Sequence, residues 1–216
     1  MNTSRRTFLA GGATLGLAMT AGCLEFVTGD APLEFDAQRV APSEATLAET
    51  GYNKQSIDQE TIEETVDIGV EREIRAAFWL STYTNELDYQ GESREAGLFA
   101  AVSLPGMSIL GQSFNPLEDM SHEELLDEFL AEAGEDDIEN IEHDESFSLQ
   151  ILEADREVDL FVGETEMDGE TVEVTIAVTS FEHEDDFIVL LGSYPDLLAD
   201  EGPNIEVLME SIEHPA

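Results

Sequence analysis

The sequence predicts an α+β protein in which an antiparallel sheet meander is covered by two or three helices. Three observations lead to this architecture. Apolar residues recur at every second position in the last third of the chain, as in Val172, Val174, Ile176 and Val178, which is typical of half-buried strands. Helical spacing of apolar residues is confined to short segments such as 125–130. The hydrophobic content of 42% is sufficient for an ordinary core and does not fit a disordered chain.

The first predicted elements lie between residues 43 and 95. A short helix should follow Pro42, with Ser43 as its N-cap and Gly51 as its C-terminal stop. Strands are expected over 61–68 and 73–84, joined by a turn over 69–72. Trp79 and Tyr83 share one face of the second strand and are interpreted as core, with an exposed binding surface as the alternative. The polar segment 87–95 is predicted to be a loop.

The middle of the chain combines a buried strand with a helix. Residues 98–104 are almost wholly apolar and should form a central strand, which Pro105 interrupts and which can resume over 107–110. Ser121 and Glu124 have the spacing of a capping box. They predict a helix that ends at Gly134, followed by an acidic linker over 135–145.

The last third is predicted to be a meander. Strands are expected over 147–152, 158–162, 172–178 and 187–191. The segment Met167–Glu170, with Asp168-Gly169 at its centre, predicts a hairpin, and residues 181–185 predict a turn. A final helix should begin at Pro203.

The N-terminus has the pattern of an export signal. Arg5 and Arg6 form a twin-arginine motif, and residues 20–23 form a lipobox that ends in Cys23, the single cysteine. The run from Phe8 to Gly22 has 15 residues, short of the roughly 20 that a membrane-spanning helix needs. We therefore expect a signal peptide over 1–22, a lipidated tether over 23–33 and one α+β domain over 34–216, divisible at 97/98. The alternative is an uncleaved N-terminal helix with a chance cysteine.

The charge balance predicts a high-salt environment. The chain has 8 basic and 50 acidic residues, a net charge of −42; loss of Arg5 and Arg6 with the signal would leave −44. At an ionic strength of about 1 M the Debye length falls to roughly 3 Å, so most of the self-repulsion disappears. The sequence has no basic patch that would bind nucleic acid or an anionic membrane surface. Export would use the twin-arginine translocase, and lipid on Cys23 would hold the protein at the outer face of the cell membrane.

No sequence motif identifies a catalytic residue, a cofactor site or a metal site. The four histidines, His122, His143, His183 and His214, lack the spacing of a helical zinc site and are expected at the surface. Dense acidic runs, as at 135–137 and 184–186, can be read as a solvated surface or as a cation-binding surface. The leading expectation is a binding or envelope-assembly module with an unknown protein or small-molecule partner. The alternatives are a membrane-tethered hydrolase that uses scattered acids and a histidine, and a transporter's binding component, for which the chain is short.

Two resemblances accompany these patterns. Arg5-Arg6, Cys23, the Leu47–Tyr52 segment and Ser193-Tyr194-Pro195 resemble an uncharacterised family of secreted lipoproteins of halophilic archaea, which implies no activity. From Phe99 onward the order of elements is similar to the PsbP-like α/β/α sandwich. That similarity is carried by the 121–133 helix, the Asp168-Gly169 hairpin and the 204–213 helix. It implies partner binding or assembly rather than catalysis, although a fold does not transfer a function.

Overall fold

The computed structural model describes residues 32–67, 71–89, 92–109, 112–133, 138–167, 169–198 and 201–216. The chain forms two compact units. The smaller unit contains the described residues of 1–34 together with 62–75. The larger unit contains Phe35–Thr61 and Ala76–Ala216.

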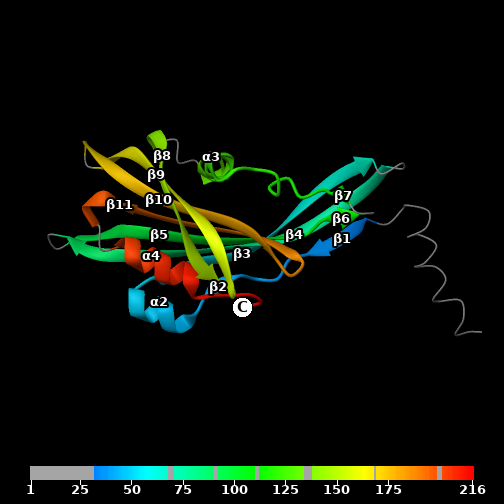
Figure 1. Ribbon diagram of the computed structural model, residues 1–216, viewed down its shortest axis with the longest axis horizontal. Coiled ribbons are helices and arrows are strands. Elements are labelled where there is room, and N and C mark those ends of the chain that lie inside the picture. Colours follow the sequence, from blue (N-terminus) through cyan, green and yellow to red (C-terminus); the bar gives the residue numbers. More distant parts are fainter. Residues whose placement is uncertain are drawn as a thin grey trace, which may run out of the picture. The chain divides into compact units, whose positions relative to one another are not determined.

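Eight strands form the main sheet (Figure 1). Their order is β1-β4-β5-β11-β10-β9-β8, with β3 paired to β4. Their bounds are β1 Leu33–Asp36, β3 Asn53–Asp67, β4 Glu71–Tyr89, β5 Glu92–Pro105, β8 Glu139–Ile151, β9 Ala154–Met167, β10 Glu170–His183 and β11 Asp186–Pro195.

Two short strand pairs and a few helices complete the described chain. β2 (Ala41–Pro42) pairs with β12 (Ile212–Glu213), and β6 (Ser108–Ile109) pairs with β7 (Gln112–Ser113). The helices are α2 (Glu44–Thr50), α3 (His122–Ala133), α4 (Glu201–Glu210) and a 3-10 turn, η1 (Asp196–Leu198).

The predicted helix-covered α+β class, with its PsbP-like variant, is wrong. Strands make up 64% of the described residues and helices only 19%, and the eight strands form one mixed sheet. The helices are too short to cover strands of this length. A 12-residue helix such as α3 is about 18 Å long, whereas the 14 residues of β10 span about 46 Å.

Several predicted loops are strands instead. The segment 87–95 contributes to a long hairpin in which Tyr89 pairs with Glu92. The linker predicted over 135–145 contains the start of β8, where Glu139 pairs with Glu164 of β9. The turn predicted over 181–185 shrinks because β10 continues to His183. Backbone hydrogen bonds hold these segments in the sheet, so they need no alternation of apolar side chains.

Signals at the ends of elements are confirmed. The Ser43 hydroxyl accepts a hydrogen bond from the Thr46 N–H, and Gly51 ends α2 in the left-handed conformation at φ 79°. In the capping box of α3, Ser121 N–H donates to the Glu124 carboxylate at 2.8 Å, and Glu124 N–H bonds to the Ser121 hydroxyl. The backbone hydrogen bond from Ser121 holds the pKa of Glu124 below its usual value. Gly169 turns the β9–β10 hairpin at φ 81°, and Asp168 lies outside the described residues, as does Gly134.

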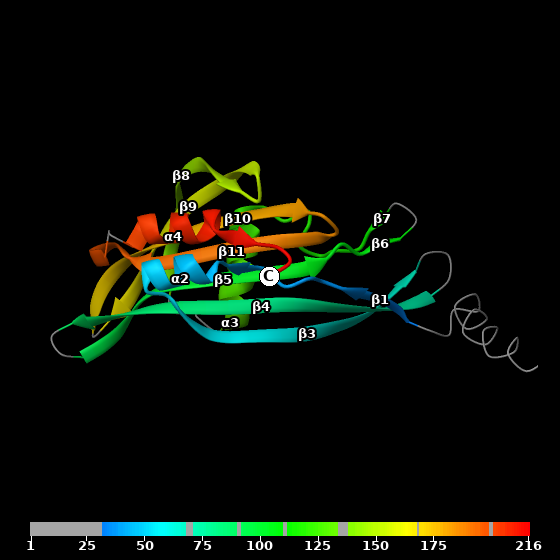
Figure 2. The same cartoon turned by 90° about the horizontal axis from the view of Figure 1, so that it is seen from below.

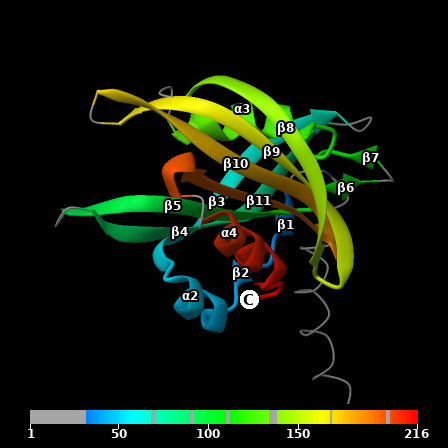
Figure 3. The same cartoon turned by 60° about the vertical axis from the view of Figure 1, so that its left-hand side comes forward.

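The larger unit buries both faces of its central strands. Along β11, Ile188 and Leu190 point into one core cluster with α4, whereas Phe187 and Val189 point into a second cluster with α3. Figures 2 and 3 show α2 and α4 side by side on one face and α3 on the other. Burial on both faces explains why this strand is continuously apolar. Tyr83 also belongs to the first cluster and is 2% exposed, which confirms its interpretation as core.

The smaller unit carries a concentration of charge. Arg75 lies 2.6 Å from the Glu63 carboxylate and 3.8 Å from those of Glu34 and Glu73. All four side chains are more than one third exposed. Exposed ion pairs contribute little stability individually, so this cluster serves mainly to offset local repulsion between the acids.

Candidate functional site

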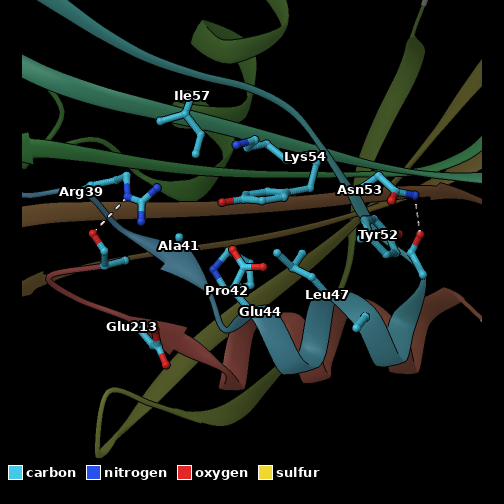
Figure 4. A pocket seen from close by; sticks show the side chains of 14 residues that line it. Arg39, Ala41, Pro42, Glu44, Leu47, Tyr52, Asn53, Lys54, Ile57 and Glu213 are labelled. Atoms are coloured by element: carbon cyan, nitrogen blue, oxygen red, sulfur yellow. Dashed lines mark hydrogen bonds between the residues drawn. The ribbon is translucent and has the colours of Figure 1, made fainter.

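A pocket of about 500 Å³ lies beside α2 in the larger unit (Figure 4). The segment before α2 and α2 itself form one part of its wall. The start of β3, a residue of β4 and the last residues of the described chain form the rest. The lining residues are Arg39, Ala41, Pro42, Glu44, Leu47, Ala48, Gly51, Tyr52, Asn53, Lys54, Ile57, Tyr83, Glu213 and Ala216.

Local sequence signals fix the α2 wall of the pocket. Ser43 starts the helix and Gly51 reverses the chain, so that Tyr52 enters the core directly after it. Ser43 N–H also donates to the Ser211 carbonyl at 3.1 Å, next to the β2–β12 pair. These contacts attach the helix to the C-terminal segment and give the pocket a defined wall.

Two cations line the pocket. Arg39 Nε donates to the Ala216 carbonyl at 3.1 Å, and Ala216 N–H donates to the Arg39 carbonyl at 2.9 Å. Lys54, the only lysine of the chain, is exposed at the start of β3. Within the described residues, neither side chain lies within ion-pair distance of an Asp or Glu carboxylate. Figure 4 shows Arg39 and Lys54 on the sheet side of the pocket, opposite Leu47 on α2.

The buried phenol of Tyr83 contributes the aromatic part of the lining. Burial raises the pKa of Tyr83 above its usual value; the positive charge of Arg39 opposes this shift and Glu44 adds to it. Tyr83 therefore stays a neutral hydroxyl at ordinary pH and adds no negative charge to the pocket.

A buried polar cluster lies beneath the pocket. Tyr52 and Asn85 donate to the two carboxylate oxygens of Glu201, each at 3.1 Å, and all three residues are less than 10% exposed. Burial, followed by the adjacent Glu201 charge, raises the pKa of Tyr52 far above its usual value. The side chain of Tyr52 lies so close to Gly97 that a Cβ there would collide with the hydroxyl. The cluster thus joins the end of α2 to α4 and β4.

A second polar cluster lies at the start of α3. His122 Nδ1 is 2.7 Å from Asp159, and His122 Nε2 accepts the Ser180 N–H at 3.1 Å. Ser146 donates to the other Asp159 oxygen at 2.6 Å, and His143 Nε2 lies 3.1 Å from that hydroxyl. Burial alone would raise the pKa of Asp159, but the hydrogen bonds from Ser146 and His122 outweigh it and lower that pKa below its usual value.

These bonds determine what the second cluster can do chemically. Both ring nitrogens of His122 are occupied, so this ring has none left to take a proton from a ligand. The Ser146 hydroxyl points its hydrogen at Asp159 rather than at a histidine, which is the opposite of an activated nucleophile. The cluster therefore acts as a tie between α3, β8, β9 and β10.

A third cluster encloses the last histidine. His214 Nε2 lies 2.9 Å from Asp186 Oδ2, and the two side chains are 1% and 4% exposed. The same carboxylate oxygen accepts the Gln38 N–H at 2.7 Å, and the His183 and His214 rings meet edge to face. The expectation of four surface histidines is wrong for His214, whose buried ring pairs with Asp186, and His122 is half-buried against Asp159.

The predicted site residues and the pocket come from different parts of the chain. Arg5, Arg6 and Cys23 lie outside the described residues. No helix in the described part of the chain is long and apolar enough to cross a membrane. Sequence reasoning did not identify Arg39 or Lys54. The single signal for the pocket was that the only lysine, Lys54, lies two residues after the Leu47–Tyr52 segment.

Comparison with known proteins yields one family. No curated protein matches the chain. The family DUF6517, described as a domain of unknown function, matches residues 39–213. This range contains the three core clusters and most of the pocket lining, and it leaves out the N-terminal segment. Because the match extends over more than half of the chain, the protein belongs to the DUF6517 family.

Proposed function

We propose that this protein is an extracytoplasmic, lipid-anchored binding module of the cell envelope. Twin-arginine export through Arg5 and Arg6 and lipid attachment at Cys23 account for the order of motifs in the first 23 residues. The excess of 50 acidic over 8 basic residues supports an environment of molar salt, as in the halophilic archaea whose secreted lipoproteins the chain resembles.

The pocket beside α2 is the observation that carries the binding role. Its volume of about 500 Å³ lies within the usual range for small-molecule sites. Its lining combines apolar side chains with a few charged ones, and α2 and the β2–β12 pair hold its walls. A ligand there would bind at a preformed site.

Among the described residues, the alternative of a membrane-tethered hydrolase has one structural candidate, the cluster of Ser146, His143 and Asp159. Its hydrogen-bond order does not support that role, because Ser146 donates to Asp159 and the His143 ring is half exposed. The lowered pKa of Asp159 also makes this carboxylate a weak base. We therefore favour binding over hydrolysis.

Filling the pocket tests the proposal. Ala48 is exposed and lines the pocket, so Ala48→Trp should occupy it without disturbing the core. Ala131→Trp makes the same exchange at an exposed position on α3 and serves as the control. Small organic compounds would be screened for a rise in the melting temperature of the full chain, purified from membranes in molar salt.

We expect compounds that stabilise the wild type and Ala131→Trp to leave Ala48→Trp unchanged. The proposal is refuted if no compound stabilises the wild type, or if every stabilising compound acts equally on Ala48→Trp.

A further inference from the structure

We infer that the pocket beside α2 binds an organic carboxylate with an apolar body, and that Arg39 and Lys54 hold its charged end. The inference rests on the proposed binding function and specifies the class of ligand. It begins with the distribution of the few cations in a chain that has 8 basic residues among 216.

Two arginines elsewhere in the described residues, Arg75 and Arg156, have clear partners. Arg75 is surrounded by the carboxylates of Glu34, Glu63 and Glu73. Arg156 lies over the Phe181 ring at 4.3 Å and donates to the Glu182 carbonyl. Arg39 and Lys54 differ, because no Asp or Glu side chain among the described residues forms an ion pair with either of them. In a chain with 50 acids, Arg39 and Lys54 are therefore two cations of one pocket that have no acidic side chain as a partner and that a ligand anion can contact.

The bonding of Arg39 leaves part of its guanidinium available. Its Nε is used by the Ala216 carbonyl, which fixes the plane of the group. The two terminal nitrogens of Arg39 form no ion pair with an Asp or Glu side chain among the described residues. A carboxylate can accept two hydrogen bonds from such a fork. Lys54 would add a second positive charge on the same, sheet side of the pocket.

The apolar side chains of the pocket determine which body a ligand needs beside its charged group. Leu47 and Ile57 present aliphatic side chains, and the buried Tyr83 ring adds an aromatic surface. Glu44 and Glu213 also line the pocket, so the four charged side chains sum to zero. These two acids would repel a doubly charged phosphate more strongly than a single carboxylate. We therefore assign a monocarboxylate.

The negative charge of the whole protein does not prevent this binding in concentrated salt. At about 1 M ionic strength, screening reduces interactions beyond roughly 3 Å. The distant acids are then largely screened from a ligand anion, and contacts inside the pocket decide the affinity. Charge recognition should accordingly persist in molar salt.

The test compares naphthoate with its uncharged amide, naphthamide, which has nearly the same shape. Both are titrated calorimetrically into the full chain in molar potassium chloride. We expect naphthoate to bind about tenfold more tightly, a difference worth about 1.4 kcal/mol. Lys54→Gln and Arg39→Gln should each remove most of this preference, and Lys54→Arg should retain it.

Arg75→Gln is the matched control, since it removes one positive charge outside the pocket; it should leave the preference for naphthoate intact. Equal binding of the two compounds, with both excluded by Ala48→Trp, would overturn the carboxylate inference and leave the binding function standing. An unchanged preference in Lys54→Gln and Arg39→Gln together would overturn it as well. Failure of both compounds and of the wider screen would defeat both proposals.

Discussion

His214 and Asp186, 28 residues apart in sequence, form a hydrogen-bonded pair at 2.9 Å inside the larger unit. Their side chains are 1% and 4% exposed, and the carboxylate also accepts the Gln38 N–H. The pair thus attaches both the segment before β2 and the last residues of the chain to the start of β11.

Removal of this carboxylate should strongly destabilise the protein. Asp186→Ala leaves the buried His214 nitrogen and the Gln38 N–H without an acceptor, at a cost of roughly 3–5 kcal/mol in free energy of unfolding. Guanidinium denaturation in a constant concentration of potassium chloride measures this loss. Asp185→Ala is the control, because Asp185 is exposed and adjacent. Similar stabilities for the two variants would contradict the role assigned to the pair.

Tyr52 should make the fold sensitive to alkali. Its pKa is raised in the folded protein, whereas an unfolded tyrosine ionises near pH 10. Above that pH the unfolded chain loses a proton that the folded chain retains, so stability falls as pH rises. Tyr52→Phe should reduce the slope of unfolding free energy against pH above about pH 10. A slope equal to that of the wild type would show that Tyr52 does not contribute.

Asp159 should contribute stability with the opposite dependence on pH. Its pKa is lowered in the folded protein, so its contribution is complete above the unfolded value near 3.9 and is lost as pH falls through the folded value. Asp159→Asn should flatten the loss of stability below about pH 4. Asp155→Asn, an exposed carboxylate of the same strand, should leave the acid profile as it is in the wild type.

Membrane attachment should depend on a single sulfur atom. Cys23→Ser should move the protein from the membrane fraction to the soluble extracytoplasmic fraction, since no other lipid acceptor of this type exists in the chain. Exchange of Arg5 and Arg6 for lysine should instead retain the protein in the cytoplasm, which separates export from anchoring. Tight membrane association of Cys23→Ser would count against lipid attachment.

Salt should stabilise the folded chain. The net charge of −42 repels itself at low ionic strength and is screened in molar salt. The melting temperature should therefore fall on dialysis from molar to millimolar potassium chloride. A melting temperature independent of salt would refute this expectation.

Signals at single residues predicted the ends of elements well. Ser43 and Gly51 mark the two ends of α2, and Ser121 with Glu124 begins α3, because caps depend on backbone groups within a few residues.

The length of the strands was underestimated because exposed strands lack a pattern of apolar side chains. Nearly all residues of β3 are exposed or half-exposed, so its acidic side chains carry no alternation, and its order comes from backbone pairing with β4. The strand predicted over 61–68 was therefore too short, and the segments 87–95 and 135–145, which also belong to strands in part, were predicted as a loop and a linker.

The candidate site was harder to predict than the fold. Its residues come from 39–57, from Tyr83 and from the last residues of the chain, and only the folded sheet brings these together. The two histidine–carboxylate pairs were hard to predict for the same reason. Asp159 and Asp186 compensate His122 and His214 from 37 and 28 residues away in sequence, and nothing in the local sequence identifies these partners.

The contact between Arg39 and Ala216 has a practical consequence for handling the protein. Because Ala216 lines the pocket, an affinity tag joined to it would emerge at the entrance of the proposed binding site and would obstruct it. The hairpin turn at Gly169 has no atom within 4 Å of the position of a Cβ. An epitope inserted there would leave the entrance clear.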